Sequence, residues 1–259
     1  MPWKHYHNLY KKLLILLFFM SSFFSFGQII NIENLRRVTD TTGLSGFARL
    51  DLRLQKNTNQ IFSISNRIRL QYKTPKSLWL FIHNLDFSEA NSEQLVSSNT
   101  QHLRFNHKLK PKIKWEAFLQ SQRDKIAAIK FRGLAGTGLR FKLTSLEKYK
   151  FYLGSLIMFE HEKSVNEVEN IHNDWRSSSY FSFSLYPKEN ITIVSTSYYQ
   201  PRLDNFIDYR ILSETSLSFK IIKNLKFTTS FTYMYDKFPV TGIVQEQYLL
   251  SNGLVYFFD

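Results

Sequence analysis

Apolar and polar residues alternate with a period of two along most of the chain after residue 43. From Leu44 to Leu54 the even positions carry Leu, Gly or Ala, while the odd positions carry mainly Ser, Arg and Asp. The segments 61–73, 207–221 and 226–236 repeat this pattern, with one apolar and one polar face. Such alternation predicts β-strands whose two faces meet different surroundings.

The same criterion predicts about twelve strands, and their length is informative. Besides the four segments above, the predicted strands are 78–87, 99–109, 113–122, 130–143, 149–161, 175–186, 191–200 and 246–258. The alternation is weakest at 78–87 and 149–161, where both faces carry apolar residues. These runs reach ~10–14 residues, whereas strands of globular proteins average about 5–6. A tilted strand needs roughly 9–11 residues to cross a bilayer, so the lengths favour membrane-spanning strands.

The connections between predicted strands alternate in length if the N-terminus starts in the periplasm. The connections expected on the periplasmic side are short, at 74–77, 110–112, 144–148, 187–190 and 222–225. Those expected on the outer side are longer, at 88–98, 123–130, 162–174, 201–206 and 237–245, with 56–60 as a short exception. Short periplasmic turns opposite long external loops are typical of outer-membrane barrels. A secreted β-sandwich, the alternative, has no reason to keep this order.

The N-terminus has the features of a secretory signal peptide. Lys4, Lys11 and Lys12 precede the apolar stretch 13–26, and small residues stand at 25 and 27. About 14 apolar residues are fewer than the ~20 of a spanning helix, which disfavours a membrane anchor. We therefore expect a signal peptide at 1–27, a periplasmic N-terminal segment at 28–42 and a barrel at 43–259.

The last predicted strand carries a candidate assembly signal. Ser251, Gly253, Tyr256 and Phe258 have the polar, glycine, aromatic, aromatic spacing that the barrel assembly machinery reads, although Asp259 follows the final aromatic residue. In lipid, an open sheet edge would leave backbone N–H and C=O groups unpaired. We therefore predict a closed, antiparallel, up-and-down transmembrane β-barrel of about twelve strands, monomeric and located in a bacterial outer membrane. Its expected partners are outer-membrane lipid, lipopolysaccharide and the assembly machinery.

Several short segments resemble a known family. They are Gly43–Leu54 followed by an Asn-rich turn, Asn99–Leu109, Glu116–Gln122, Arg132–Arg140, Tyr199–Pro201 and Asp236–Pro239. On these the chain is similar to the salt-induced outer-membrane protein family, a set of uncharacterised barrels. The resemblance implies a barrel and a response to salt. It implies no transport substrate and no reaction.

Charge and composition exclude some functions. The full chain carries +13, and removal of the three Lys and no acid of segment 1–27 leaves +10. Cysteine is absent, so neither disulfides nor thiolate chemistry are available. The basic residues are spread over alternate strand positions instead of forming one patch, so nucleic acid is not an expected partner.

Many basic residues fall on the face that points inward if the apolar face meets lipid. The candidate lumen-lining residues are Arg49, Arg53, Arg67, Arg69, Arg104, Arg132, Arg140, Arg176 and Arg210. Acidic residues on this face are fewer and include Glu116, Asp208 and Asp236. Arginine rings can bias a pore toward anions. Two interpretations stay open: a narrow, anion-preferring pore for small solutes, or a structural barrel that its own side chains fill.

Glycines and aromatic residues have expected places in such a barrel. Gly136 and Gly138 share the inward face of one strand, where they either leave room for long arginines opposite or let the strand bend. Aromatic side chains are expected in two belts near the strand ends. The candidates are Trp79, Trp115, Tyr149, Tyr186, Tyr233, Tyr235, Tyr256 and Phe258.

Catalysis is the less favoured alternative. No His is followed two residues later by Ser, the spacing that would place a nucleophile and its base on one strand face. His161, flanked by Glu160 and Glu162, and the segment 172–174 could form an acid–base or metal cluster in outer loops. No catalytic, cofactor or metal motif is recognised. A second alternative is lipopolysaccharide binding through Lys125, Lys130 and Arg202.

Overall fold

The computed structural model describes residues 42–56, 60–90, 93–144, 146, 148–164, 171–222 and 225–256. The expected signal peptide and Phe258 lie outside these ranges. The twelve strands are β1 (Gly43–Lys56), β2 (Gln60–Lys73), β3 (Ser77–Ala90), β4 (Glu93–Lys110), β5 (Ile113–Asp124), β6 (Ile129–Lys142), β7 (Tyr149–Ser164), β8 (Ile171–Lys188), β9 (Ile191–Pro201), β10 (Tyr209–Ile222), β11 (Leu225–Asp236) and β12 (Glu246–Tyr256). Within the described ranges, no helix has the length and apolar character needed to cross a membrane.

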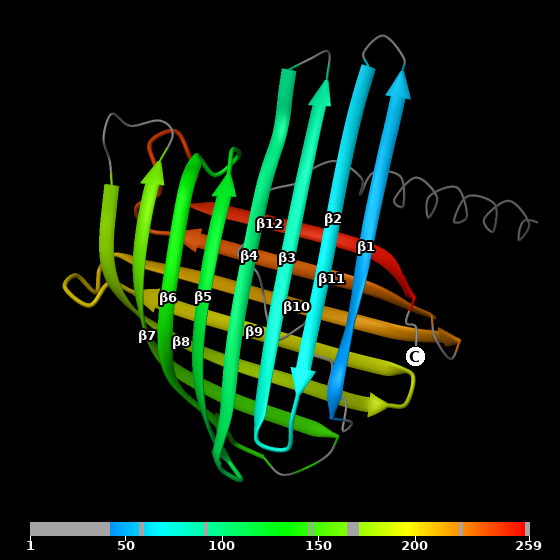
Figure 1. Ribbon diagram of the computed structural model, residues 1–259, viewed down its shortest axis with the longest axis vertical. Coiled ribbons are helices and arrows are strands. Elements are labelled where there is room, and N and C mark those ends of the chain that lie inside the picture. The colour runs from blue at the N-terminus through cyan, green and yellow to red at the C-terminus, as the bar shows by residue number, and fades with distance from the viewer. Residues whose placement is uncertain are drawn as a thin grey trace, which may run out of the picture.

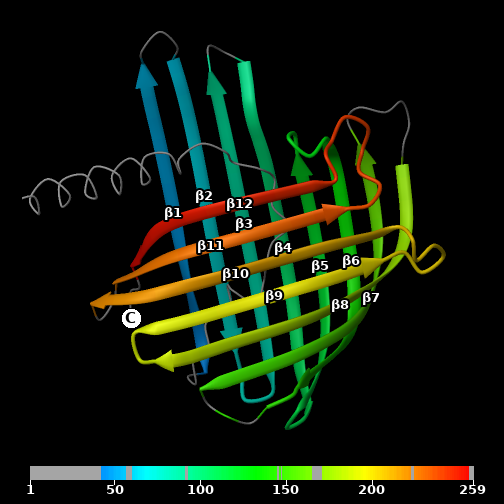
Figure 2. The same cartoon turned by 180° about the vertical axis from the view of Figure 1, so that it is seen from behind.

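Each strand pairs antiparallel with the next one in the chain, in the order β1 to β12. This confirms the predicted all-β, up-and-down architecture. Figure 1 shows β1 to β6 in the front layer and β8 to β12 behind them at a steep angle, with β7 curving between the layers. Figure 2 shows the second layer from its own side. The connections 202–208 and 237–245 lie at one end, here named the loop end. The opposite end, with 189–190, is named the turn end.

Several strands extend further than the sequence pattern predicted, which corrects the expected loop lengths. The segments 88–98 and 162–174 are mostly strand, because β4 begins at Glu93 and β8 at Ile171. Ladder pairing continues there between polar residues, since backbone hydrogen bonding does not require an apolar face. The predicted length asymmetry was therefore wrong in places. Between β3, which ends at Ala90, and β4, which begins at Glu93, the chain has two residues, whereas between β6 and β7 it has six.

The distribution of side chains is the reverse of that in a soluble protein. On β5, Glu116 and Gln122 are buried, whereas Leu119 is 59% exposed and Trp115 is 40% exposed. Other strands repeat this arrangement, with large apolar side chains exposed on the outward face. These are Leu103, Leu139, Leu153, Ile157, Trp175, Phe181, Phe219 and Phe231. The interior of the described sheet is thus largely polar, and its outer surface is apolar, as lipid contact requires.

Aromatic rings gather on the outer surface near both ends. Near the turn end, the ring centroids of Trp79 and Phe105 lie 4.4 Å apart, and those of Phe105 and Trp115 lie 5.7 Å apart. Near the loop end, Tyr209 packs between Tyr199 and Tyr235, 5.6 Å from each. Amphipathic rings prefer the lipid–water interface, so the two groups mark the borders of an apolar band.

β1 and β12 are the first and last strands of the hydrogen-bonded order, and the ladders of the described residues do not join them. In a bilayer, two unpaired edges would be costly, so we expect β1 and β12 to pair there. The absence of native cysteine allows a direct test by disulfide cross-linking. Ser45→Cys in β1 is combined in turn with Leu249→Cys, Ser251→Cys and Gly253→Cys in β12.

One of these combinations is expected to form a disulfide in vesicles and to shift the mobility of the protein on a gel. The matched control is Ser63→Cys with Ser88→Cys, because these side-chain oxygens lie 2.9 Å apart across β2 and β3. A control that cross-links while every β1–β12 pair stays reduced would contradict closure.

Candidate functional site

Glu160 on β7 lies at the centre of a charge network inside the barrel. It is 1% exposed and forms ion pairs with Arg132 of β6, Arg176 of β8 and Arg210 of β10. The Arg176 Nε donates to the Glu160 Oε2 over 2.7 Å. Arg210 reaches across from a strand three positions away in the sheet. One carboxylate therefore joins three strands to its own.

Three more carboxylates complete this network. Glu162 lies 3.4 Å from the Arg132 Nε and 3.3 Å from the Arg210 Nη2. Asp208 lies 3.1 Å from the Arg176 Nη1, and Asp236 lies 2.7 Å from the Arg210 Nε. We name the set Arg132, Glu160, Glu162, Arg176, Asp208, Arg210 and Asp236 the loop-end cluster. It holds three guanidiniums and four carboxylates, so the inward arginines do not make this end of the interior positive.

Arg202 extends the network into the connection between β9 and β10. Its guanidinium lies 2.7 Å from Asp204, 3.4 Å from Asp208 and 3.5 Å from Asp174. The hydrogen bonds from Arg202 lower the pKa of the exposed Asp204 carboxyl below its ordinary value. Three carboxylates thus surround the one arginine that the sequence placed among candidate lipopolysaccharide ligands.

A second, smaller charge network lies toward the turn end. The Tyr180 hydroxyl of β8 donates to the Glu116 Oε2 of β5 over 2.7 Å, and the Arg104 Nη1 of β4 donates to the same atom over 3.3 Å. The Arg140 Nη1 of β6 lies 3.7 Å from the Glu116 Oε1. The Arg140 guanidinium also lies 3.9 Å from the ring centroid of Tyr152, a cation–π distance. We name Arg104, Glu116, Arg140 and Tyr180 the turn-end cluster.

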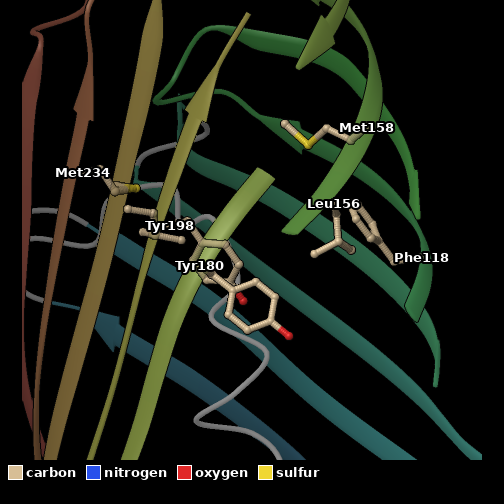
Figure 3. Close-up of a cluster of buried hydrophobic side chains, with 7 residues drawn as sticks. Phe118, Leu156, Met158, Tyr180, Tyr198 and Met234 are labelled. Atoms are coloured by element: carbon tan, nitrogen blue, oxygen red, sulfur yellow. The ribbon is translucent and has the colours of Figure 1, made fainter. Parts of the chain in front are cut away.

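An apolar layer fills the interior between the two clusters. It consists of Phe118, Leu156, Met158, Tyr180, Tyr198, Leu212 and Met234, which come from six strands. In Figure 3 the labelled members point from both walls into one shared space. Met158 is 0% exposed, and Leu156 and Leu212 are each 2% exposed. Side chains therefore occupy this level of the interior.

Glycines make room for two rings of this layer. A Cβ on Gly136 would collide with the Phe118 ring, and a Cβ on Gly154 would collide with the Tyr180 ring. The space left by these missing side chains is taken by aromatic rings. It is not taken by long arginines, which the sequence had offered as one alternative for Gly136.

The structure buries six of the candidate arginines and places the others in the first two strands. The buried residues are Arg69, Arg104, Arg132, Arg140, Arg176 and Arg210. Arg67 on β2 is exposed. The backbones of Arg49 and Arg53 in β1 pair with Arg67 and Ser63. Of the assembly-signal candidates, Ser251, Gly253 and Tyr256 lie in β12.

The apolar layer was not among the features predicted from the sequence. One signal was present in the pattern, because the strand predicted at 149–161 carried apolar residues on both faces. Leu156 and Met158 are the inward apolar residues responsible for this. The same exception at 78–87 corresponds to Leu80 and Ile82, which are buried on the inward face of β3.

The suggested cluster around His161 is divided between the two faces of β7. Because β7 continues to Ser164, neighbouring side chains point to opposite sides. Glu160 and Glu162 point inward to the arginines, while the His161 Nδ1 lies 2.7 Å from the Asn173 Oδ1 and its ring packs near Phe131. Among the described residues, no group of three His, Cys, Asp or Glu is arranged to hold a metal ion.

Two small cavities remain in the interior. The first, of about 30 Å³, touches both clusters and the apolar layer, and its lining includes Arg104, Arg132 and Met158. The second, of about 70 Å³, lies at the loop end and is lined by Arg132, Glu162, Asp236 and residues of the β11–β12 connection. Pockets for drug-sized ligands typically measure ≈ 300–1,000 Å³. The described interior therefore has space for water or small ions at these two places.

Comparisons with known proteins agree with this architecture. A family model described as "Protein of unknown function, DUF481" matches residues 52–258, so the chain belongs to this family. The "salt-induced" part of the expected family name stays a prediction. Among curated proteins, none matches the chain.

Two solved structures are similar to the chain. The NanC porin shares 8% sequence identity over 81% of this chain and 100% of the porin, with a TM-score of 0.51. The translocator domain of the autotransporter NalP from Neisseria meningitidis shares 10% identity over 85% of this chain and 90% of that domain, with a TM-score of 0.42. The first similarity shows that the chain has the fold of a porin barrel. It shows nothing of whether the chain transports a solute.

The charge balance of the loop-end cluster predicts a large effect of losing one arginine. Arg210→Met leaves four carboxylates, three of them buried, facing two guanidiniums, and an uncompensated buried charge costs about 3–5 kcal/mol. We expect the free energy of unfolding in lipid vesicles, measured by urea titration with tryptophan fluorescence, to fall by that amount. Arg67→Met, the same substitution at an exposed position, is the control. Equal losses in the two variants would contradict the role of the cluster.

Proposed function

We propose that this DUF481 member is an outer-membrane barrel whose interior is closed at rest by its own side chains. It would serve as a structural barrel of the envelope and not as an open channel. Its location is supported by the apolar outer surface, the two aromatic groups and the expected signal peptide. The loop end would face outward and the turn end would face the periplasm.

The observation that carries this proposal is the layered interior. Arg210 and Glu160 link β10 to β7 at one level, and Tyr180 links β8 to Glu116 on β5 at another. The apolar layer lies between these levels. An ion that crosses it must give up hydrogen bonds to water without replacing them, which is costly in an apolar environment. The two small cavities, of about 30 and 70 Å³, do not remove this barrier.

A narrow, anion-preferring pore is the second candidate. It is favoured by the turn-end cluster, where Arg104 and Arg140 share the single carboxylate Glu116. The porin fold is also compatible with transport. For this function the apolar layer would have to move, because Met158 and Leu212 lie in the way of any continuous path. The structure supports the closed state better.

The other functional expectations from the sequence are a salt response, lipopolysaccharide binding and catalysis, and the structure supports them less than the closed barrel. We retain a response of expression to salt from the family resemblance. Lipopolysaccharide binding through Lys130 would use an exposed charge, but Arg202 already has three carboxylate partners. We propose no catalytic activity, since the histidine at 161 faces away from the carboxylates beside it.

Planar-bilayer conductance of refolded residues 28–259 tests the closed barrel. The unmodified protein is expected to show no steady conductance. Met158→Ala combined with Leu212→Ala removes side-chain volume from the apolar layer, so this variant is expected to conduct. The control, Ile157→Ala, shortens the neighbouring outward residue, which is 52% exposed, and should leave the barrel closed.

Steady, anion-selective current through the unmodified protein would contradict the closed barrel and support the pore. A double variant that stays folded, as judged by its heat-resistant mobility on gels, and still does not conduct would show that the apolar layer is not the seal.

A further inference from the structure

The 30 Å³ cavity is lined by basic, neutral polar and apolar side chains but by no acidic one. Its lining residues with polar groups are His102, Arg104, Gln120, Arg132, Ser178, Tyr198 and Gln200, and no carboxylate lies among its lining residues. Glu116 and Glu160 pair with Arg104 and Arg132 but do not line the space. The cavity therefore presents guanidinium, amide and hydroxyl groups without a negative charge. From this lining we propose that the cavity binds a small inorganic anion of the chloride class.

Gln120 provides an independent reason to expect an acceptor in this cavity. Its side chain is 8% exposed, and its Oε1 lies 3.0 Å from the His102 Nδ1. A carbonyl oxygen can only accept a hydrogen bond, so the His102 Nδ1 carries the proton and donates it. The Gln120 Nε2 is buried without a hydrogen-bond partner. Since buried donors are nearly always satisfied, a ligand that accepts hydrogen bonds fits this position.

The size and walls of the cavity restrict the ligand further. A water molecule needs roughly 10–15 Å³ of such space, so about 30 Å³ admits two waters or one halide-sized ion. The apolar side chains of Phe118, Leu134, Met158 and Leu212 complete the wall and cannot hydrate an ion. Desolvation is less severe for a large monovalent halide than for a small, strongly hydrated ion, because the Born cost falls with ionic radius. A cation would face two guanidiniums and is excluded.

This site does not depend on whether the barrel conducts. A chloride ion held beside Arg104 and Arg132 would contribute to the stability of the closed interior. It would equally be a resting place for an anion if the apolar layer opened. Binding is therefore tested by structure and stability, without measuring current.

Bromide is the crystallographic probe, because it resembles chloride and scatters anomalously. Crystals of the folded protein grown in sodium bromide are expected to show one anomalous peak beside the Gln120 Nε2 and the two arginines. In detergent, the unfolding temperature is expected to rise with sodium chloride and not with sodium gluconate at equal ionic strength. Two ordered waters without a bromide peak, or equal responses to chloride and gluconate, would overturn the proposal.

Two matched variants separate this site from general salt effects. Gln120→Glu introduces a carboxylate that would occupy the donors of the cavity, so both the chloride response and the bromide peak should be lost. Gln122→Glu makes the same change two residues along the inward face, at a residue that lines the other cavity and is 2% exposed. It should keep both signals. A bromide peak that persists in Gln120→Glu would mark an adventitious ion only and would also overturn the proposal.

Discussion

The need to neutralise charge inside the barrel governs the rest of this structure. The inward-pointing side chains of several strands bring arginines together with Glu116, Glu160, Glu162, Asp208 and Asp236. Burial makes any unpaired charge among these groups costly. The ion pairs therefore extend past neighbouring strands, as between Arg210 and Glu160. These links cross the interior at two levels and leave little space for solvent. The closed interior that we propose would follow from the same pairing that makes the buried charges tolerable.

The apolar layer depends on these two clusters and also supports them. Tyr180 belongs to both, because its ring packs in the layer while its hydroxyl donates to Glu116. Gly154 permits this position, since any side chain there would collide with the ring. Packing and ion pairing are thus joined through one residue. This explains why an interior that is mostly polar still contains an apolar level.

Most of the fold could be predicted from the sequence, because alternation with period two identifies both the strands and their faces. All twelve predicted strands correspond to strands of the structure, including the weak segment at 149–161. The ends were less predictable, since polar residues beyond the apolar band still form ladders, as at Ser98 and Glu162. Composition suggested loops there, while backbone hydrogen bonding continued the strands.

For interior residues, the sequence predicts which face of the strand they occupy but not which residues they contact. The positions of Arg132, Arg176 and Arg210 on the polar face followed from the pattern. Their common partner Glu160 did not, because periodicity says nothing about the level of a residue or about which strands meet across the interior. For the same reason, counting arginines suggested a positive lumen. The structure pairs three of them with four carboxylates instead.

The account rests most of all on the outward orientation of the apolar face, and spin labels in lipid vesicles test it most directly. Labels would be placed at the outward positions Leu139, Ile157 and Phe231 and at the half-buried inward positions Ser218 and Thr228. Oxygen dissolved in lipid is predicted to relax the outward labels strongly, while a water-soluble nickel chelate leaves them unaffected. The inward labels should not respond to lipid-dissolved oxygen in this way. Outward labels that respond mainly to the chelate would contradict a barrel that meets lipid with its apolar face.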